Sequence, residues 1–170
     1  MKRITLSIIL LIVLLAGVFT TTAFAYDDDD DNDDRLDRVR RATEKFHKIS
    51  RAQAAGYDLV PGLDYCFENP GVGGMGYHYI NVSLLDTTVN ALKPEAMVYA
   101  PKRNGKLQLA AVEYIVPAAD WDAANTEPPR LFGQTFELNT DLGVYTLHAW
   151  IWKHNKLGMF FDWNPKVSCP

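Results

Sequence analysis

The sequence lacks the short motifs that identify common enzyme classes. It contains no G-x-S-x-G element for a serine nucleophile, no C-x-x-C pair and no closely spaced histidine motif such as H-x-H or H-E-x-x-H. Its glycines at positions 71, 73, 74 and 76 follow a cysteine-containing loop rather than a strand, which favours a flexible segment over nucleotide binding. A functional site, if present, therefore has to be assembled by the fold.

The N-terminal segment carries the clearest signal in the chain. A short basic start at Lys2 and Arg3 precedes an apolar stretch from Ile4 to Val18 and the sequence Ala23-Phe24-Ala25. This order is typical of a secretory signal peptide over residues 1–25. We expect cleavage there and a mature protein that is secreted or extracytoplasmic, with no stable membrane anchor. An uncleaved anchor is the alternative, but this stretch of 15 residues is shorter than the roughly 20 residues that span a bilayer.

Net charge is small outside one short segment. Beyond residue 25 the chain has 15 basic and 21 acidic residues, and seven of the acids lie in Asp27–Asp34. The remainder is close to neutral, which argues against nucleic acid as a partner because such binding depends on neutralising phosphates. The aspartate run cannot enter a core, so we expect an acidic, disordered tail over 26–34. Calcium capture and contact with a basic surface are the alternatives, although the run lacks the ligand spacing and glycine of a calcium loop.

Cysteine is limited to Cys66 and Cys169. In an exported protein an isolated pair is expected to form one disulfide. Closing so long a loop stabilises a fold by about 4–5 kcal/mol in the chain-entropy model. A catalytic thiol is the alternative, disfavoured because Cys169 is one residue from the C-terminus and Cys66 lies in a Gly/Pro-rich loop.

The rest of the chain predicts one α+β domain over 35–170, a long N-terminal helix packed on an antiparallel β-sheet. The helix is expected over Asp34–Ala55, where apolar residues recur at three- and four-residue steps, with Gly56 ending it. Residues 57–76 are rich in turn signals, and residues 120–129 are expected to form an exposed loop. The expected strands are 77–81, 96–101, 107–117, 145–153 and 159–163, with a hairpin at Asn104-Gly105.

Four short sequence segments occur together in a recognisable order. They read MGYHYIN at 75–81, VEY at 112–114, LHAWIW at 147–152 and DWNP at 162–165. In this respect the chain resembles a group of secreted bacterial proteins whose activity is uncharacterised. The resemblance extends from about Arg41 onward and implies one fold across that span, but it assigns no catalytic residue.

Strand alternation gives one candidate site. Side chains alternate across a strand, so His78, Glu113 and His148 converge on one face if their strands are neighbours. Two imidazoles and a carboxylate are a ligand set for a divalent transition metal such as zinc, iron or copper. Without metal they suit general acid–base work. The simpler alternative is a pair of core histidines hydrogen-bonded to backbone or to Glu113. Alternation places Leu109, Ala111 and Ile115 beside Glu113, and Trp150 and Trp152 beside His148.

Three functions follow from this site. The first is a secreted domain that binds a small molecule, glycan or protein partner through an aromatic and histidine-lined face, with Tyr79, Trp150 and Trp152 supplying stacking surfaces. The second is a secreted metal-binding protein or metalloenzyme that uses His78, Glu113 and His148. The third is a structural envelope protein. Asp162 either caps a turn or orients His148. The sequence leaves open whether the protein is an enzyme.

Overall fold

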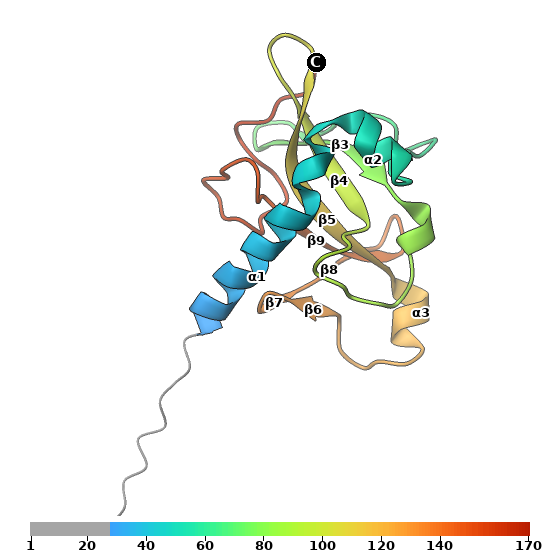
Figure 1. Ribbon diagram of the computed structural model, residues 1–170. Coiled ribbons are helices and arrows are strands. Elements are labelled where there is room, and N and C mark those ends of the chain that lie inside the picture. The colour runs from blue at the N-terminus through green and yellow to red at the C-terminus, as the bar shows by residue number, and fades with distance from the viewer. Residues whose placement is uncertain (1–27) are drawn as a thin grey trace, which may run out of the picture.

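The computed structural model describes residues 28–170 of the chain (Figure 1). The expected signal peptide over 1–25 lies outside the described residues, as do Tyr26 and Asp27 at the start of the expected acidic tail. Within 28–170 no helix has both the length and the apolar character needed to cross a bilayer.

The fold is mixed α+β with an antiparallel sheet, as the sequence predicts. The main sheet has the strand order β1-β3-β4-β5-β9-β8, and β2 also pairs with β3. Its strands are β1 (Asp58–Leu59), β2 (Phe67–Asn69), β3 (Gly73–Ile80), β4 (Ala96–Pro101), β5 (Leu107–Pro117), β8 (Glu137–Asn139) and β9 (Val144–Ala149). The remaining elements are β6 (Arg130–Leu131), β7 (Gln134–Thr135), η2 (Val82–Leu84) and α3 (Ala118–Asp122).

The N-terminal helical region is broken, so the prediction of one long helix over Asp34–Ala55 is wrong. It consists of a 16-residue helix α1 (Asp28–Thr43), a 3₁₀ turn η1 (Glu44–His47) and a short helix α2 (Ile49–Ala54). Tyr99 from β4 donates a hydrogen bond to the Phe46 carbonyl at 2.6 Å. That carbonyl is therefore bonded to the sheet, and Lys48 adopts an extended conformation that separates η1 from α2. Gly56 (φ 93°) ends α2 as predicted.

Helix α1 begins inside the segment expected to be a disordered tail. The structure makes residues 28–34 helical, which differs from the expectation of extended chain over 26–34.

The predicted bounds of the two central strands are correct, and those of the C-terminal strands are wrong. β4 and β5 match their predicted bounds, and the backbone of 102–106 closes the expected Asn104-Gly105 hairpin. β9 ends at Ala149 rather than Lys153, and residues 159–163 form no strand. The predicted loop over 57–76 contains β1, β2 and the start of β3, whose glycines are strand residues rather than a flexible segment. The predicted loop over 120–129 begins within α3.

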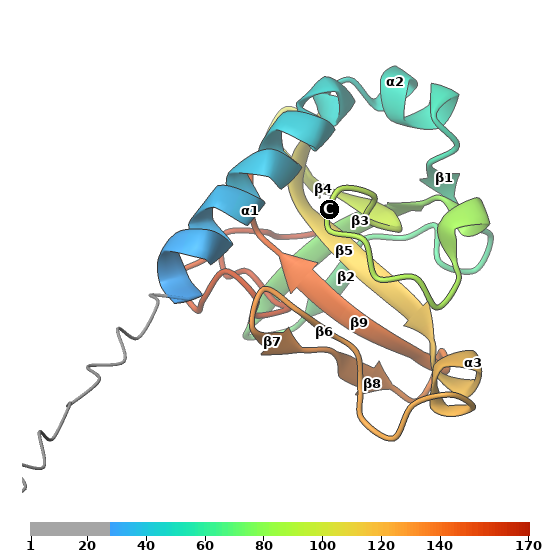
Figure 2. The same ribbon diagram turned by 60° about the horizontal axis from the view of Figure 1, so that its bottom comes forward.

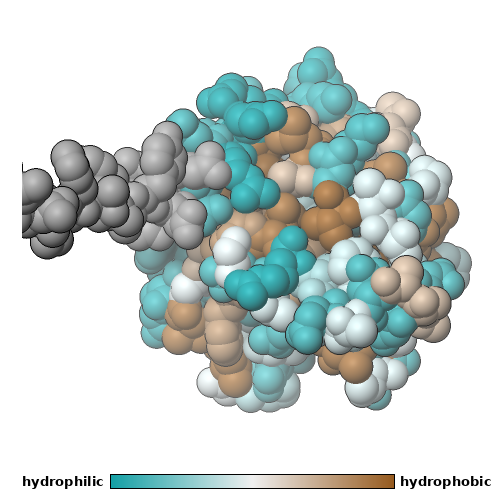
Figure 3. Space-filling model, turned by 90° about the horizontal axis from the view of Figure 1, so that it is seen from below, coloured by the Kyte–Doolittle hydropathy of each residue, from teal (hydrophilic) through white to brown (hydrophobic). Residues whose placement is uncertain are grey.

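The two faces of the sheet are covered by different parts of the chain. α1 lies across one face (Figures 1 and 2), where Leu36, Val39 and Phe46 join a core with Tyr99 and Tyr114. On the other face, residues of the C-terminal segment pack against small strand residues in a second cluster, which consists of Val98, Ala100, Ala110, Ala111, Trp150 and Val167. Seen from below, hydrophobic side chains are interspersed among hydrophilic ones (Figure 3).

Glu95, just before β4, is a carboxylate placed in the core. It is 4% exposed, and its Oε2 accepts a hydrogen bond from the Ile115 backbone N–H at 2.9 Å. Burial raises the pKa of Glu95 from 4.5 to about 7, and the Ile115 N–H opposes part of that shift. The folded protein therefore favours the protonated carboxyl.

We expect Glu95 to reduce stability as pH rises. Below its ordinary pKa of 4.5 the carboxyl is protonated in both states, whereas from there to about 7 the unfolded chain ionises first. The free energy of unfolding should fall over that window by up to about 3 kcal/mol. Glu95→Gln keeps an acceptor for Ile115 without the charge, so its stability relative to the parent should rise between about pH 5 and about pH 8.

Urea unfolding at both pH values measures this difference. The exposed Glu127→Gln variant is the matched control for loss of one carboxylate. A Glu95→Gln difference that is equal at the two pH values would show that the core carboxyl does not titrate as described.

Candidate functional site

Three strands bring His78, Glu113 and His148 to the same face of the sheet. Glu113 on β5 pairs directly with His148 on β9. His78 on β3 lies on the far side of β4, which presents Ala96 opposite Glu113 and Val98 opposite His78. The small Ala96 side chain leaves room for His78 and Glu113 to meet above β4. The predicted convergence of the three side chains is confirmed.

The polar atoms of the cluster lie at short and similar separations. His78 Nε2 is 3.3 Å from His148 Nε2 and 3.5 Å from Glu113 Oε2, and Glu113 Oε1 is 3.4 Å from His148 Nδ1. Each of the three residues offers a ligand atom, and these atoms all lie within 4.8 Å of one another. The Nδ1 atoms of both histidines are buried and have no hydrogen-bond partner among the described residues.

Burial controls the protonation of the cluster. The exposed fractions are 5% for His78, 8% for Glu113 and 1% for His148. Burial lowers the pKa of His78 to about 4, and burial together with the neighbouring His78 lowers the pKa of His148 well below its usual value. Burial raises the pKa of Glu113 to about 8, with a smaller contribution from the charge of Asp162. All three groups therefore favour their neutral forms in the isolated protein.

Asp162 lies at the edge of the cluster, in the C-terminal segment. Its Oδ1 is 3.7 Å from His148 Nδ1, which is beyond hydrogen-bond distance but close enough for a small rotation to join them. Burial and the charge of Glu137 raise the pKa of Asp162 to about 6. The carboxylate is thus placed to orient His148, as the sequence suggested.

Only one of the three predicted aromatic residues lies beside the cluster. The Trp150 ring stacks near His148 with centroids 6.0 Å apart, and its Nε1 donates to the Phe161 carbonyl at 2.6 Å. Tyr79 lies on the helix-covered face against Tyr99, as its alternation with His78 requires. The inclusion of Tyr79 in the site was therefore wrong.

Trp152 also lies on the helix side of the sheet, contrary to the prediction. Its ring is 4.4 Å from that of His47, and its Nε1 donates to Thr43 Oγ1 at 3.2 Å. Strand alternation fails because β9 ends at Ala149, after which the Trp150 N–H bonds to the Met159 carbonyl rather than along a ladder. Both Trp152 and His47 are thereby remote from the cluster.

A bulge changes the predicted neighbours of Glu113. Val98 pairs with Ala111, but the next pair is Tyr99 with Leu109, so Ala110 is an extra residue in β5. Leu109 therefore belongs to the helix-side core, not to the face of Glu113. The prediction for Ala111 and Ile115 stands, because both lie on the Glu113 side of the bulge.

A cavity of about 420 Å³ opens beside the cluster, with His78, Glu113 and Asp162 in its wall. Its other walls are mainly hydrophobic and come from β2, β3, β5, β8, β9 and the loops between them. Sequence reasoning missed most of these residues: Leu63, Phe67, Met75, Leu85, Glu137, Leu138, Leu142 and Trp163. They lie in short strands and loops where no periodic pattern marks a face.

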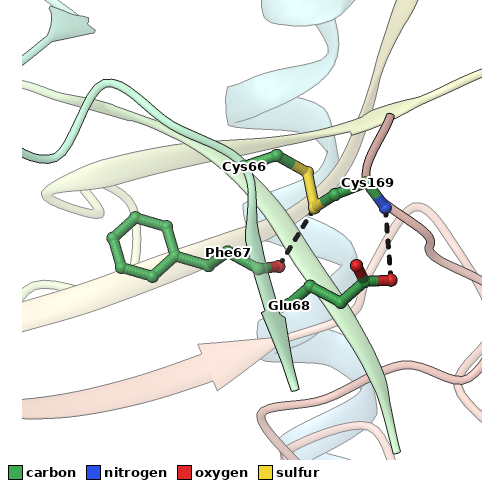
Figure 4. Close-up of a disulfide and its surroundings, with 4 residues drawn as sticks. All are labelled: Cys66, Phe67, Glu68 and Cys169. Atoms are coloured by element: carbon green, nitrogen blue, oxygen red, sulfur yellow. Dashed lines mark hydrogen bonds between the residues drawn. A yellow bond between two sulfur atoms is a disulfide. The ribbon is translucent and has the colours of Figure 1, made fainter. Parts of the chain in front are cut away.

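The predicted disulfide is present and holds one wall of this cavity. Cys66 and Cys169 are bonded, with Cα atoms 5.6 Å apart (Figure 4). The next residue, Phe67, packs edge-on against His78 with ring centroids 5.0 Å apart. Glu68 Oε1 accepts a hydrogen bond from the Cys169 N–H at 3.4 Å, which also ties β2 to the C-terminus. The disulfide thereby positions Phe67 over the histidine cluster.

Comparisons of the chain with protein-family models, with curated proteins and with solved structures found no match. The function of the protein is therefore inferred from the geometry and chemistry of the site.

Proposed function

We propose that this protein binds one divalent transition-metal ion through His78, Glu113 and His148. The observation that carries the proposal is the meeting of three ligand-bearing side chains, each at least nine-tenths buried, with ligand atoms within 4.8 Å of one another. Two nitrogens or oxygens bound to one tetrahedral ion at about 2.0–2.1 Å lie roughly 3.3–3.4 Å apart. The contacts of His78 Nε2, at 3.3 Å to His148 Nε2 and 3.5 Å to Glu113 Oε2, fit that spacing.

A purely structural pair of core histidines accounts less well for the same contacts. A bare histidine pair leaves unexplained why the carboxyl groups of Glu113 and Asp162 approach the buried Nδ1 of His148 to 3.4 and 3.7 Å. A bound ion gives the Nε2 atoms of His78 and His148 a ligating role. It also leaves His148 Nδ1 facing Glu113 and Asp162, and such a carboxylate commonly orients a ligating histidine.

The donor set favours zinc, iron or copper over calcium or magnesium. Calcium and magnesium prefer oxygen ligands, whereas two imidazoles and one carboxylate suit the later transition metals. Three protein ligands leave at least one coordination position for water or another molecule. That position would face the adjoining cavity, so both metal-dependent binding and metal-dependent catalysis are compatible with the site.

We place this metal-binding protein outside the cytoplasm. The Cys66–Cys169 disulfide supports an oxidising compartment. The order of basic, apolar and Ala-x-Ala segments over residues 1–25 supports export by signal peptide. N-terminal sequencing of secreted material should begin at Tyr26.

Metal titration tests the proposed function. Protein treated with chelator and dialysed should take up one Zn²⁺ or Co²⁺ per chain. Bound Co²⁺ should show the visible absorption bands that are typical of a four- or five-coordinate ion. Metal at 100 times its Kd should raise the free energy of unfolding by about 2.7 kcal/mol. The double variant His78→Ala, His148→Ala should bind no metal stoichiometrically.

The matched control is His154→Ala, which removes an exposed imidazole and should bind metal as the parent does. Far-UV circular dichroism checks that the double variant is folded. The conservative variant Glu113→Gln should retain the fold and bind metal more weakly. The proposal fails if the chelated parent takes up no stoichiometric metal, or if the folded double variant binds it as tightly as the parent.

A further inference from the structure

The cavity beside the cluster extends along β5. Its wall follows this strand from Glu113 through Ile115 to Pro117, a distance of about 13 Å at the usual rise per residue. The paired residues of β9 and β8 continue the same face, with Thr146 opposite Glu137 and Val144 opposite Asn139. At about 420 Å³ the cavity is large enough for a small organic molecule.

The charges in the cavity wall are all of one sign. Glu137 and Asp162 supply carboxylates, Glu113 favours its neutral form, and none of the described residues that line the cavity is lysine or arginine. Glu137 is close enough to Asp162 for its charge to act on that carboxyl. His78 faces the same space with a side chain that is 7% exposed and has an unpartnered Nδ1. A cavity with this lining attracts cations and repels anions.

The remaining wall and the rim are hydrophobic. Leu63, Phe67, Ile80, Ile115 and Trp163 form much of the wall. Three further lining leucines are exposed on the molecular surface: Leu85 by 37%, Leu138 by 50% and Leu142 by 49%. Exposed leucines gathered at a cavity favour an apolar ligand that covers them.

We propose that this cavity binds an organic cation with an apolar body, of the alkylammonium class. The ammonium group lies between Asp162 and Glu137, and the alkyl chain lies along Ile80 and Ile115. Phe67 and Trp163 add aromatic surface, which also interacts favourably with an ammonium group. The inference goes beyond the proposed metal function, because it depends on the carboxylates of the cavity wall and does not require a bound metal ion.

Other small ligands fit this lining less well. A fatty acid or phosphate ester would bring a negative charge toward the carboxylates of Glu137 and Asp162, with no basic side chain among the described lining residues to pair with it. A glycan needs many hydrogen-bonding groups, whereas the uncharged polar side chains in the wall are Asn139 and Thr146. An ammonium group on a hydrocarbon chain pairs with the carboxylates and packs against the apolar side chains of the wall.

Calorimetric titration with octylamine, octanoate and octan-1-ol tests the proposal. The three probes share one chain length and differ in head-group charge. Octylammonium should bind one site per chain at least about tenfold more tightly than octanoate. The double variant Glu137→Gln, Asp162→Asn should reduce this preference to about twofold or less. The control Asp120→Asn, Glu127→Gln removes two exposed carboxylates outside the cavity lining and should keep it.

Titrations of chelated and Zn²⁺-loaded protein separate this inference from the proposed function. Octylamine that fails to bind either form, or octanoate that binds as tightly, overturns the inference while Zn²⁺ uptake still stands. Octylamine that binds the folded double variant as tightly as the parent overturns it as well. Octylamine bound by protein that takes up no Zn²⁺ supports the inference and removes the metal function alone.

Discussion

Replacing both Cys66 and Cys169 with serine should lower the free energy of unfolding by about 4–5 kcal/mol. The disulfide closes a loop with a sequence separation of 103 residues, so its removal gives the unfolded chain a large gain in conformational entropy. It also releases the C-terminal segment, which covers one face of the sheet through Val167. Urea unfolding of the parent and the double variant measures the difference.

The parent protein treated with a strong reductant provides the control, because it loses the same bond without any amino-acid substitution. Reduced parent and double variant should unfold at similar urea concentrations. The variant should also bind Zn²⁺ more weakly, because Phe67 would no longer be held against His78. A loss of less than about 1 kcal/mol in both proteins would contradict the prediction and would mean that the unfolded chain without the bond stays structured enough to gain little entropy.

Gly76→Ala should be a strongly destabilising substitution in β3. Gly76 has φ 109°, which L residues rarely adopt, and an added Cβ would lie 2.4 Å from the Tyr99 carbonyl oxygen. That oxygen belongs to the neighbouring strand β4, so the sheet itself would have to move. We expect a loss of about 2–5 kcal/mol from backbone strain and overpacking together.

The matched control is Gly105→Ala, in the β4–β5 turn. Gly105 also has a positive φ, 75°, but nothing lies within 4 Å of its added Cβ. This variant should lose only the conformational part, about 1–2 kcal/mol. Thermal or urea unfolding of both variants tests the comparison, and equal losses at the two positions would contradict the close contact with Tyr99.

Sequence pattern predicted the parts of the fold whose structure is set by neighbours along the chain. β4 and β5 are apolar runs joined by Asn104-Gly105, and their bounds match the structure. The apolar stripe of α1 through Leu36 and Val39 was likewise visible. The Phe46 carbonyl, in the 3₁₀ turn after α1, accepts a hydrogen bond from Tyr99, 53 residues away, and no local sequence pattern records that contact.

The C-terminal segment shows the same limit more clearly. Residues 159–163 have the composition of a strand, but side chains and isolated backbone hydrogen bonds hold them in place of a ladder with a neighbouring strand. Asn155 donates to the carbonyls of Phe161 and Trp163, and the Trp150 indole donates to Phe161 as well. After Ala149, alternation no longer predicts which face of the sheet a side chain occupies, and the predicted position of Trp152 is wrong for that reason.

The site was predictable where each residue was a polar exception in a regular strand. His78, Glu113 and His148 meet this condition, and their convergence follows from alternation and strand order. The cavity wall was not predictable, because Leu63, Leu85 and Leu142 lie outside the strands. Asp162 was recognised only as a residue that could orient His148.

The way His78 and Glu113 meet across β4 has a consequence for how an ion would act on the whole molecule. The ligands come from three strands, and His78 and His148 are 70 positions apart in the sequence. No local fragment of the chain can present them together, so the unfolded chain offers no pre-arranged chelate. Metal uptake would then report on completion of the sheet, and chelation would lower the cooperative melting temperature rather than loosen a single loop.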